Sequence, residues 1–318
     1  MKELVINKND AGQRIDKFLT KYMPDMPRAM LYKGLRKNCV KVNGKHIKEG
    51  GFMLSEGDML KLYFKDEFFC VPHTDDAFVN IKPNIDIIYE DENIILTDKK
   101  PGVNVHADEN GSTNTLIDHI KAYLCQKGEY DPQKEQSFAP ALCNRIDRNT
   151  GGIVIAAKNA EALRIMNQKI KNREMKKLYL LIAVGILPQK HGQIKNYLFK
   201  DEKKKTVYAY DSPKKGAKTA ITEYRVLAEK GGNSLVEAEL ITGRTHQIRA
   251  QFAAIGHPLL GDGKYGSNKT NRGSGFHHQA LYSYKLKFLF TTDSGILSYL
   301  DNMEFSVEHV PFADGFIG

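Results

Sequence analysis

GRTHQIRAQFAAIGHPLLGDGKYG, residues 243–266, is the stretch of this sequence that says most about its fold. Two arginines, a histidine and a glutamine lie between Arg244 and Arg249, directly after Leu235–Thr242, which predicts a β-strand. Such a cluster can hold phosphates or close around a carboxylate, because guanidinium groups pair with both in a bidentate manner. The alternative is a solvated helix start. Apolar residues at helical spacing favour partial burial instead: Ile248, Phe252 and Ile255.

A second polar stretch precedes another predicted strand. Residues 144–152, NRIDRNTGG, place Asp147 between Arg145 and Arg148, and they lead into the apolar run Ile153–Ala157. A carboxylate held by a guanidinium is a committed anion, suited to nucleophilic or general-base work. The alternative is a salt bridge that braces a turn, with the glycine pair supplying positive φ. Residue types alone favour the bracing role.

The first part of the chain predicts a small unit of helices and short strands. Apolar residues recur at helical spacing over residues 12–22, where Asp10 is placed to cap the helix. Pro27 favours the start of a second helix, and Asn43-Gly44 is the strongest short signal for a hairpin turn. A last strand is predicted at Met59–Phe64.

Positive charge is concentrated in this small unit. Seven lysines or arginines and no acid lie between Arg28 and Lys48, across the second helix and the hairpin. Most charge runs are solvated faces, but this unit is too small to hold an active site of its own. We interpret the run as a binding surface for a polyanion, in keeping with the net charge of +9.

From Ile85 onward the pattern predicts a different unit. Strands are expected on both sides of a turn at residues 90–93, and helices are expected at residues 115–124 and 161–171. Strands outnumber helices and rarely alternate with them, so we predict an α+β fold built on a mixed, largely antiparallel sheet. Further strands are predicted at residues 153–157, 178–184, 220–227 and 235–242.

Several classes of protein are disfavoured by missing motifs. The sequence has no Walker loop, no G-x-G-x-x-G after a strand and no G-x-S-x-G, which argues against nucleotide hydrolysis, dehydrogenation and esterase chemistry. The four cysteines form no C-x-x-C pair and the histidines have no zinc-ligand spacing, so no metal is expected. No apolar run approaches the ~18–20 residues that span a bilayer, and the N-terminus lacks a signal-like apolar core. We therefore expect a cytoplasmic protein without a membrane partner.

Most of residues 12–64 resembles the alpha-L RNA-binding domain, a module named after a small-subunit ribosomal protein. The resemblance is carried by RIDKFLTKYM from Arg14, by KNCVKVNGKHI from Lys37 and by the closing Gly57-Asp58. It implies that the second helix and the hairpin bind RNA through five basic residues: Arg28, Lys33, Arg36, Lys37 and Lys41. The lysine-rich stretch 190–218 is then either a second RNA-facing insertion or a soluble loop.

Nearly all of residues 85–290 resembles the RluA-type pseudouridine synthase family. The resemblance is carried by the two stretches 144–152 and 243–266, by Lys177-Leu178-Tyr179 before an apolar strand, and by IIYEDENIILTDKKPGVNVH at residues 87–106. It implies isomerisation of uridine to pseudouridine, a reaction that needs no metal, nucleotide or redox cofactor. Because an alpha-L domain often precedes members that act on large-subunit ribosomal RNA, that RNA is the expected partner.

The resemblance also implies roles for individual residues. Asp147 would be the essential carboxylate, Arg249 would pair with it and keep it ionised, and Tyr179 would pack against the target base. Further basic residues near these stretches are expected to contact RNA: Arg145, Arg148, Arg244 and His246. Three positions depart from the family pattern, with Asn144 and Gln251 in place of histidines and Gly152 in place of a serine.

These observations predict a domain order and leave two alternatives for function. We expect an RNA-binding domain at residues 1–66, a linker at 67–84 and a catalytic domain at 85–318, in a monomer. The departures keep open a non-catalytic RNA-binding or ribosome-assembly factor. A transfer-RNA target is also open, since related enzymes divide between substrates.

Overall fold

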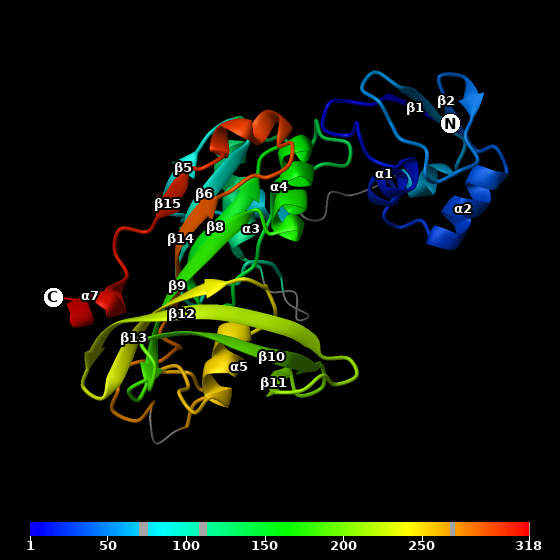
Figure 1. Ribbon diagram of the computed structural model, residues 1–318. Helices are drawn as coiled ribbons and strands as arrows, with labels where there is room; N and C mark the ends of the chain where they lie inside the picture. Colours follow the sequence, from blue (N-terminus) through cyan, green and yellow to red (C-terminus); the bar gives the residue numbers. More distant parts are fainter. Residues whose placement is uncertain (70–75, 108–112, 268–270, 318) are drawn as a thin grey trace. The chain divides into compact units, whose positions relative to one another are not determined.

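The computed structural model describes residues 1–318 apart from 70–75, 108–112, 268–270 and 318 (Figure 1). The chain forms two compact units, of which the first combines residues 1–84 with 117–141 and 157–164. The second combines residues 85–116, 142–156 and 165–318. Part of the expected linker, residues 70–75, lies outside the described residues. The domain boundaries at 66 and 84 stay predictions.

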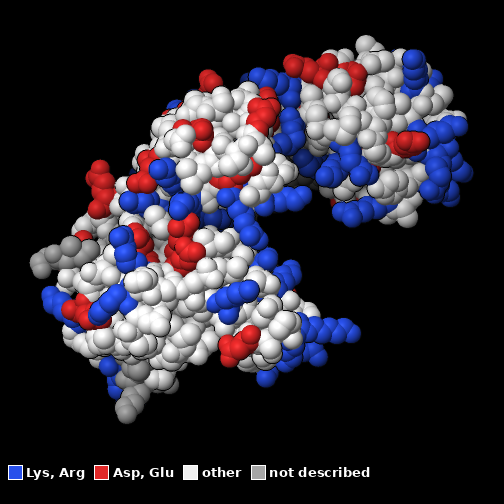
Figure 2. Space-filling view, viewed as in Figure 1, with Lys and Arg blue, Asp and Glu red and all other residues white. Residues whose placement is uncertain are grey.

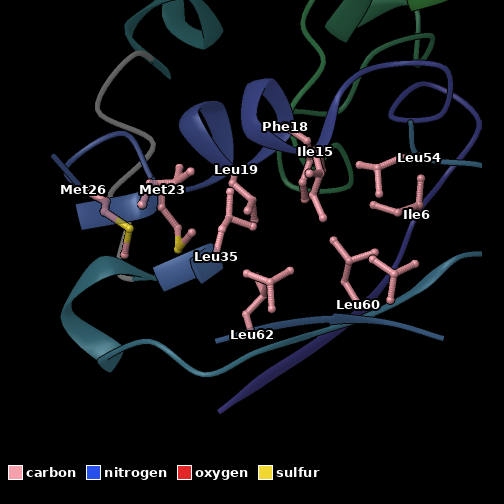
Figure 3. Packing of buried hydrophobic residues seen from close by; sticks show 13 residues of the cluster. Ile6, Ile15, Phe18, Leu19, Met23, Met26, Leu35, Leu54, Leu60 and Leu62 are labelled. Carbon is pink, nitrogen blue, oxygen red and sulfur yellow. The ribbon is translucent and has the colours of Figure 1, made fainter. Parts of the chain in front are cut away.

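The N-terminal part of the first unit packs two helices against a four-stranded sheet. The helices are α1 (Ile15–Tyr22) and α2 (Arg28–Arg36). The sheet has the order β1-β4-β2-β3, with bounds β1 (Lys2–Val5), β2 (Val40–Val42), β3 (Lys45–His46) and β4 (Met59–Leu62). Figure 3 shows the core between them, to which α1 contributes the predicted apolar stripe of Ile15, Phe18 and Leu19, all fully buried.

The predicted hairpin and the predicted second helix are both confirmed. Asn43 and Gly44 have φ values of 49° and 81° between β2 and β3, the pair of left-handed residues that a type I′ turn requires. The Asn43 side chain also accepts a hydrogen bond from Met59 N at 2.9 Å, which ties the turn to β4. Pro27 occupies the residue just before α2.

Asp10 does not cap α1, contrary to the prediction. The helix begins later than expected, at Ile15, and the side chain of the preceding Arg14 makes no capping bond. Asp10 is instead fully buried, where it accepts hydrogen bonds from Gln13 Nε2 at 3.3 Å and from the Ser137 hydroxyl. The carboxylate is thus used to join the N-terminal segment to residues distant in sequence, and burial raises its pKa.

Helical segments account for the rest of the first unit. It includes most of α3 (Leu116–Gln126) and the start of α4 (Ala160–Asn172), close to the two helices expected from the sequence. Short 3-10 turns lie at η1 (Asp66–Phe68) and η2 (Asp76–Asn80).

The second unit is built on one eleven-stranded sheet, in the order β11-β10-β12-β13-β9-β14-β8-β6-β5, with β15 beside β14 and β7 beside β8. The strands β14 and β8 pair in parallel, whereas the pairs from β11 through β10, β12, β13 and β9 to β14 are antiparallel. The predicted α+β class with a mixed, largely antiparallel sheet is therefore confirmed. The strand bounds are β5 (Ile87–Glu90), β6 (Ile94–Lys99), β7 (Ala141–Leu142), β8 (Gly151–Ala157), β9 (Met175–Val184), β10 (His191–Asp201), β11 (Thr206–Tyr210), β12 (Lys218–Lys230), β13 (Asn233–Leu240), β14 (Leu281–Phe288) and β15 (Glu304–Ser306).

The described helical segments of this unit are the larger part of α4, α5 (Gln247–Ala254), α7 (Pro311–Ile317) and the 3-10 turn η3 (Gly295–Leu300). Strand β8 is buried at all seven positions, which explains why its sequence is a continuous apolar run rather than an alternating one. The lysine-rich stretch 190–218 is not a plain loop, because it contains β10 and β11. No helix among the described residues is long and apolar enough to cross a membrane.

Candidate active site

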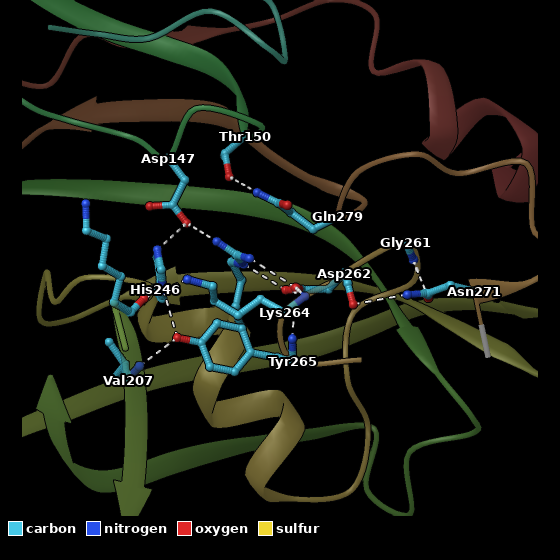
Figure 4. Close-up of polar contacts among 12 residues, drawn as sticks. Asp147, Thr150, Val207, His246, Gly261, Asp262, Lys264, Tyr265, Asn271 and Gln279 are labelled. Carbon is cyan, nitrogen blue, oxygen red and sulfur yellow. Dashed lines mark hydrogen bonds and ion pairs between the residues drawn. The ribbon is translucent and has the colours of Figure 1, made fainter. Parts of the chain in front are cut away.

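A cavity of about 770 Å³ opens in the second unit between the loop before β8, strand β9 and the turn that leads into α5. Its walls include Asp147, Tyr179 and Arg249, three residues that are far apart in sequence. The fold therefore brings the three expected catalytic residues to one site. Figure 4 shows the polar contacts around Asp147.

Arg249 joins two carboxylates. Its Nη1 lies 2.7 Å from Asp147 Oδ2, while Nε and Nη2 donate to Asp262 at 2.7 and 3.0 Å. Asp262 is fully buried, whereas the Asp147 side chain keeps 26% of its surface exposed. Burial alone lowers the pKa of Arg249, but the two carboxylates outweigh it and raise the pKa. The bidentate grip of Asp262 thus fixes the guanidinium, and one nitrogen is left to hold Asp147.

The turn into α5 is exposed at Gly243, Arg244 and Thr245, and hydrogen bonds of the buried Gln247 fix it. Gln247 Oε1 accepts from Thr242 Oγ1 at 2.9 Å and from Arg244 N at 3.1 Å, and its Nε2 donates to Ile221 O at 3.0 Å. His246, just before the helix, has a left-handed backbone with φ 50°. Residues 247–252 are all buried, which confirms the expectation of a partly buried face for Ile248 and Phe252. Ile255 was expected on the same face but is 40% exposed, and only the residues before the helix, 243–245, are solvated.

His246 is held beside Asp147 by Tyr265. Its Nδ1 lies 2.8 Å from the Tyr265 hydroxyl, which also accepts a hydrogen bond from Val207 N at 2.9 Å. The His246 Nε2 atom lies 3.8 Å from Asp147 Oδ2. Burial lowers the pKa of His246, although Asp147 acts in the opposite direction. A neutral imidazole at neutral pH follows, so His246 would contact RNA as a hydrogen-bonding group and not as a cation.

The loop that carries Asp147 is braced from below by Lys99. The ammonium of this fully buried lysine donates to the carbonyl oxygens of Lys100, Val103 and Arg148 at 3.0, 3.0 and 2.8 Å. Burial lowers the pKa of Lys99 to about 8, against the influence of Asp147. The Lys99 ammonium therefore ties the loop that carries Asp147 to the segment after β6.

The other end of this loop is also tied down. Thr150 Oγ1 accepts a hydrogen bond from Gln279 Nε2 at 3.2 Å, and both residues are buried. Arg148 Nε donates to Gly102 O at 3.0 Å while the side chain stays exposed. Asp147 thus pairs with Arg249, which is remote in sequence, and the structure shows no ion pair between Asp147 and its neighbours Arg145 and Arg148.

Tyr179 and Lys177 project from β9 toward the cavity. They are two positions apart on the strand, which places them on the same face. Tyr179 is 6% exposed, and burial raises its pKa to about 12. Lys177 is half-buried, forms no ion pair with any described residue and has its pKa lowered by burial. A phenol and an unpaired ammonium therefore line the same wall.

The remaining predicted RNA-binding residues fall into two groups. Four of them line the cavity, of which three are exposed and His246 is half-buried: Arg145, Arg148, Arg244 and His246. The others belong to the first unit, where all but the half-buried Lys41 are exposed: Arg28, Lys33, Arg36, Lys37 and Lys41. Figure 2 shows the blue side chains that gather over this unit. Their contact with RNA stays a prediction.

The structure accounts for the departures from the family pattern and corrects one of them. The family pattern at this point is H-R-L-D-R-x-T-S-G. When its aspartate is aligned with Asp147, its serine falls on Gly151 and not on Gly152. A Cβ at Gly151 would lie 2.3 Å from the Tyr282 ring, so this ring occupies the space that a side chain at position 151 would need. Gly152 has φ +112°, and a Cβ at this position would lie 2.1 Å from Ser283 O, so only glycine fits. It alone supplies the positive φ that was expected of the glycine pair.

The other two departures are satisfied by hydrogen bonds. Asn144 Oδ1 accepts from Ile155 N at 2.8 Å and so braces the loop against β8. Gln251 is fully buried, where it accepts from Thr222 Oγ1 at 2.6 Å and donates to Ile194 O at 3.1 Å. Neither Asn144 nor Gln251 has a buried side-chain polar atom without a hydrogen-bond partner.

Four residues of the site were not singled out from the sequence: Lys99, Asp262, Tyr265 and Gln279. Asp262 and Tyr265 lie within the quoted stretch 243–266. A signal was available for Asp262, because a buried arginine requires a carboxylate partner. Among the described residues, no group of three or more histidines, cysteines or acids is arranged to hold a metal ion.

Comparison with known proteins shows the family to which the chain belongs. Residues 93–254 match the family model described as RNA pseudouridylate synthase, and residues 13–60 match the S4 domain. The two matches define an RNA-modifying isomerase with an RNA-binding domain ahead of it. The chain belongs to the RNA pseudouridylate synthase family, as the resemblance implied.

The similarity to relatives extends over most of the chain. An uncharacterized RNA pseudouridine synthase of Mycoplasma genitalium is 33% identical over 98% of this chain and 97% of its own. The ribosomal large subunit pseudouridine synthase D of Neisseria meningitidis is 30% identical over 87% of this chain and 72% of its own. The solved human RNA pseudouridylate synthase domain containing 4 has a TM-score of 0.55 at 20% identity, covering 71% of this chain and 89% of its own, which shows the shared fold.

Proposed function

We propose that this chain isomerises specific uridines of large-subunit ribosomal RNA to pseudouridine, with Asp147 as the catalytic carboxylate. The observation that carries the proposal is the ion pair of 2.7 Å between Asp147 and Arg249 inside a cavity whose wall contains Tyr179. Arg249 is anchored by Asp262, so Asp147 is presented to the cavity as an ordered anion. An ordered anion next to a pocket for a base is what cleavage of a glycosidic bond requires.

The reaction exchanges one bond of the nucleotide for another. The bond from uracil N1 to ribose C1′ breaks, the base turns, and uracil C5 joins C1′. The C5 proton is then lost and N1 gains one, so atoms and charge balance without a cofactor. Asp147 could start the reaction by attack on C1′ or by removal of a ribose proton, and both routes use the same carboxylate.

The surrounding residues would assist in ways that follow from their contacts. Tyr179 stays protonated at neutral pH because its pKa is about 12, so it offers an uncharged ring to the target base. The uridine must first leave its stack, at a cost of about a few kcal/mol. The exposed Arg145, Arg148 and Arg244 at the cavity could hold phosphates on either side of the extruded nucleotide.

Two observations support ribosomal RNA over transfer RNA as substrate. Two of the relatives are named ribosomal large subunit pseudouridine synthases C and D. The S4 match and the basic surface of α2 suit a large folded RNA, which such a domain grips by its shape and backbone. Transfer RNA is the second candidate, and a cytoplasmic monomer remains the expected state.

The test is pseudouridine mapping of total RNA, by carbodiimide labelling and reverse transcription, in cells with and without the gene. The deletion is complemented with wild type, with Asp147→Asn, and with Asp66→Asn as a control on an exposed carboxylate of the first unit. We expect discrete stops in large-subunit ribosomal RNA that vanish on deletion and return with wild type and the control alone. Stops confined to transfer RNA would reassign the substrate. Stops restored equally by Asp147→Asn would refute the catalytic role, and no change in any RNA would favour a binding factor.

A further inference from the structure

The edge of the large sheet carries a row of aromatic side chains. Tyr197 lies opposite Tyr210, and Phe199 lies opposite Tyr208, where β10 pairs with β11. Directly opposed residues share a face, and so do residues two apart on one strand. The four rings therefore lie on one face of the β10–β11 hairpin, which we call the aromatic face (Tyr197, Phe199, Tyr208 and Tyr210).

The aromatic face points away from the protein core. The alternate residues of the same strands, Leu198 and Val207, are buried in a cluster with Ala250 of α5. Tyr208 is 39% exposed, and the other three aromatic residues are half-buried. Within the described part of the chain, none of the four rings makes a ring–ring contact with another aromatic side chain. The four rings are thus not stacked against any other described aromatic side chain, and Tyr208 offers the largest exposed surface among them.

Lysines surround the aromatic face. Residues 195–218 contain eight lysines and three acids. The Lys214 ammonium lies 4.0 Å from the centre of the Tyr210 ring, a cation–π arrangement. Lysines 203–205 form the exposed turn between β10 and β11. A surface that alternates rings and cations is complementary to a strand of stacked bases and phosphates.

The hairpin is continuous with the candidate active site. Lys200 lies on the face opposite to the aromatic rings, and it lines the catalytic cavity. Arg244, also in the cavity wall, donates from Nε to Thr219 O at 3.1 Å, on the strand next to β10. One edge of the hairpin thus borders the cavity while its outer surface offers the rings.

We infer that the aromatic face binds unpaired RNA bases of the substrate, on the face of the hairpin opposite to the one that borders the cavity. Sheet-borne aromatic side chains bind single strands because every base has a π-face to stack on. The inference goes beyond the proposed function, since it concerns how RNA is held and not which bond is changed. Cross-strand aromatic pairs also stabilise hairpins by themselves, so the test must separate binding from folding.

The test compares two RNA probes by fluorescence anisotropy with the full-length protein. One probe is a labelled oligouridylate of about 12 nucleotides, within the range of single-strand site sizes, and the other is a duplex of the same length. The variants are Tyr208→Leu and the double variant Phe199→Leu/Tyr208→Leu. Tyr299→Leu is the control, because Tyr299 is 42% exposed and lies elsewhere, in η3.

We expect Tyr208→Leu to weaken oligouridylate binding about fivefold, the lower end of the effect of removing a stacking ring. The double variant should lose more affinity for the oligouridylate than Tyr208→Leu does. Duplex affinity and the salt dependence should stay as in wild type, because no charge changes. Equal affinity of wild type, Tyr208→Leu and Tyr299→Leu for the oligouridylate would overturn the inference, and so would an equal loss for both probes.

A second variant guards against a hairpin that fails to fold. Changing lysines 203–205 to glutamine keeps the aromatic rings and should lower the slope of log affinity against log salt, by about 0.7 for each phosphate that the protein no longer neutralises. An unchanged slope would overturn the binding site, whatever the melting temperature of the tyrosine variants. Neither measurement involves turnover, so the outcome does not depend on whether pseudouridine is formed.

Discussion

The two units of the molecule use positive charge in opposite ways. Arg249 is 8% exposed and is held by two carboxylates, one of them fully buried. Arg36 and Lys37 at the end of α2 are exposed and pair with no described carboxylate. A buried ion pair contributes little net stability but fixes geometry, whereas an exposed cation binds polyanions by releasing their counterions. The buried charge of Arg249 therefore fixes the position of Asp147, whereas the exposed charges at the end of α2 contribute affinity for a polyanion.

The strongest test of this contrast is Arg249→Met. Losing the guanidinium frees Asp147 and leaves Asp262 buried without its partner. We expect kcat to fall about 10²–10³-fold, comparable to the loss of one fixed charge-stabilising donor, and unfolding free energy to fall by about 3–5 kcal/mol. Single-turnover assays and chemical denaturation measure the two effects.

A double variant separates chemistry from folding. Arg249→Met/Asp262→Leu removes both buried charges, and replacing a whole buried pair by apolar residues is often neutral for stability. Stability should therefore return while kcat stays low. Recovery of kcat together with stability would mean that Arg249 supports only the fold.

The contrast also explains what could be read from the sequence. The basic surface of α2 is local in sequence, so a count of charges finds it. The pairing of Arg249 with Asp262 depends on the fold of residues 250–261, and no local pattern shows it. The three residues proposed for catalysis were predicted from long motifs, because spacing alone gives no sign that Asp147 and Arg249 meet.

Strand β10 was not predicted because both of its faces mix apolar and polar residues. Its buried face contains polar Asn196, which is 5% exposed and accepts a hydrogen bond from Gln251 Nε2 at 3.2 Å. Its outer face contains Tyr197 and Phe199 among lysines. Alternation of apolar and polar residues, which signals a half-buried strand, is thus lost. By contrast, β8 and β9 are mostly buried and read clearly as apolar runs.

The buried region should also resist return of the family's serine. In Gly151→Ser the new Cβ meets the Tyr282 ring, whose hydroxyl is fixed to Asp98 Oδ1 at 2.6 Å. We expect a loss of about 1–3 kcal/mol, as for overpacking in a core. In the double variant Gly151→Ser/Tyr282→Leu the loss should be smaller than the sum of the two single losses. Additive losses in thermal or urea unfolding would contradict this contact.

Lys177 is intermediate between the buried, paired Arg249 and the exposed cations of α2, because it is half-buried but forms no ion pair with a described residue. We expect Lys177→Met to raise KM about tenfold with little change in kcat, if its ammonium binds a phosphate of the target nucleotide. Lys176→Met is the matched control, because Lys176 is exposed on the opposite face and pairs with Glu239 at 3.4 Å. Equal KM values for the two variants would contradict the role.

The pH dependence of KM sharpens this prediction. Burial lowers the pKa of Lys177, so this lysine loses its charge at a lower pH than an ordinary lysine, whose pKa is about 10.4. Wild-type KM should therefore rise on the alkaline side before the lysines with an ordinary pKa titrate, whereas Lys99, whose pKa is about 8, titrates in wild type and in the Lys177 variants alike. Lys177→Arg should keep a low KM over the same range, because arginine stays charged.

The smallest expected effect belongs to α2. Neutralising Arg36 and Lys37 to glutamine removes two exposed charges without touching the core, so melting temperature and kcat should not change. If both meet phosphates of a duplex, the slope of log affinity against log salt should fall by about 0.9 for each. Affinity for ribosomal RNA is then lost mainly at low salt and converges with wild type as salt rises. Glu56→Gln on an exposed turn of the same unit serves as the control. Because counterion release acts on binding alone, a fall in kcat under saturating RNA would show that α2 also positions the substrate, and the division between position and affinity would fail.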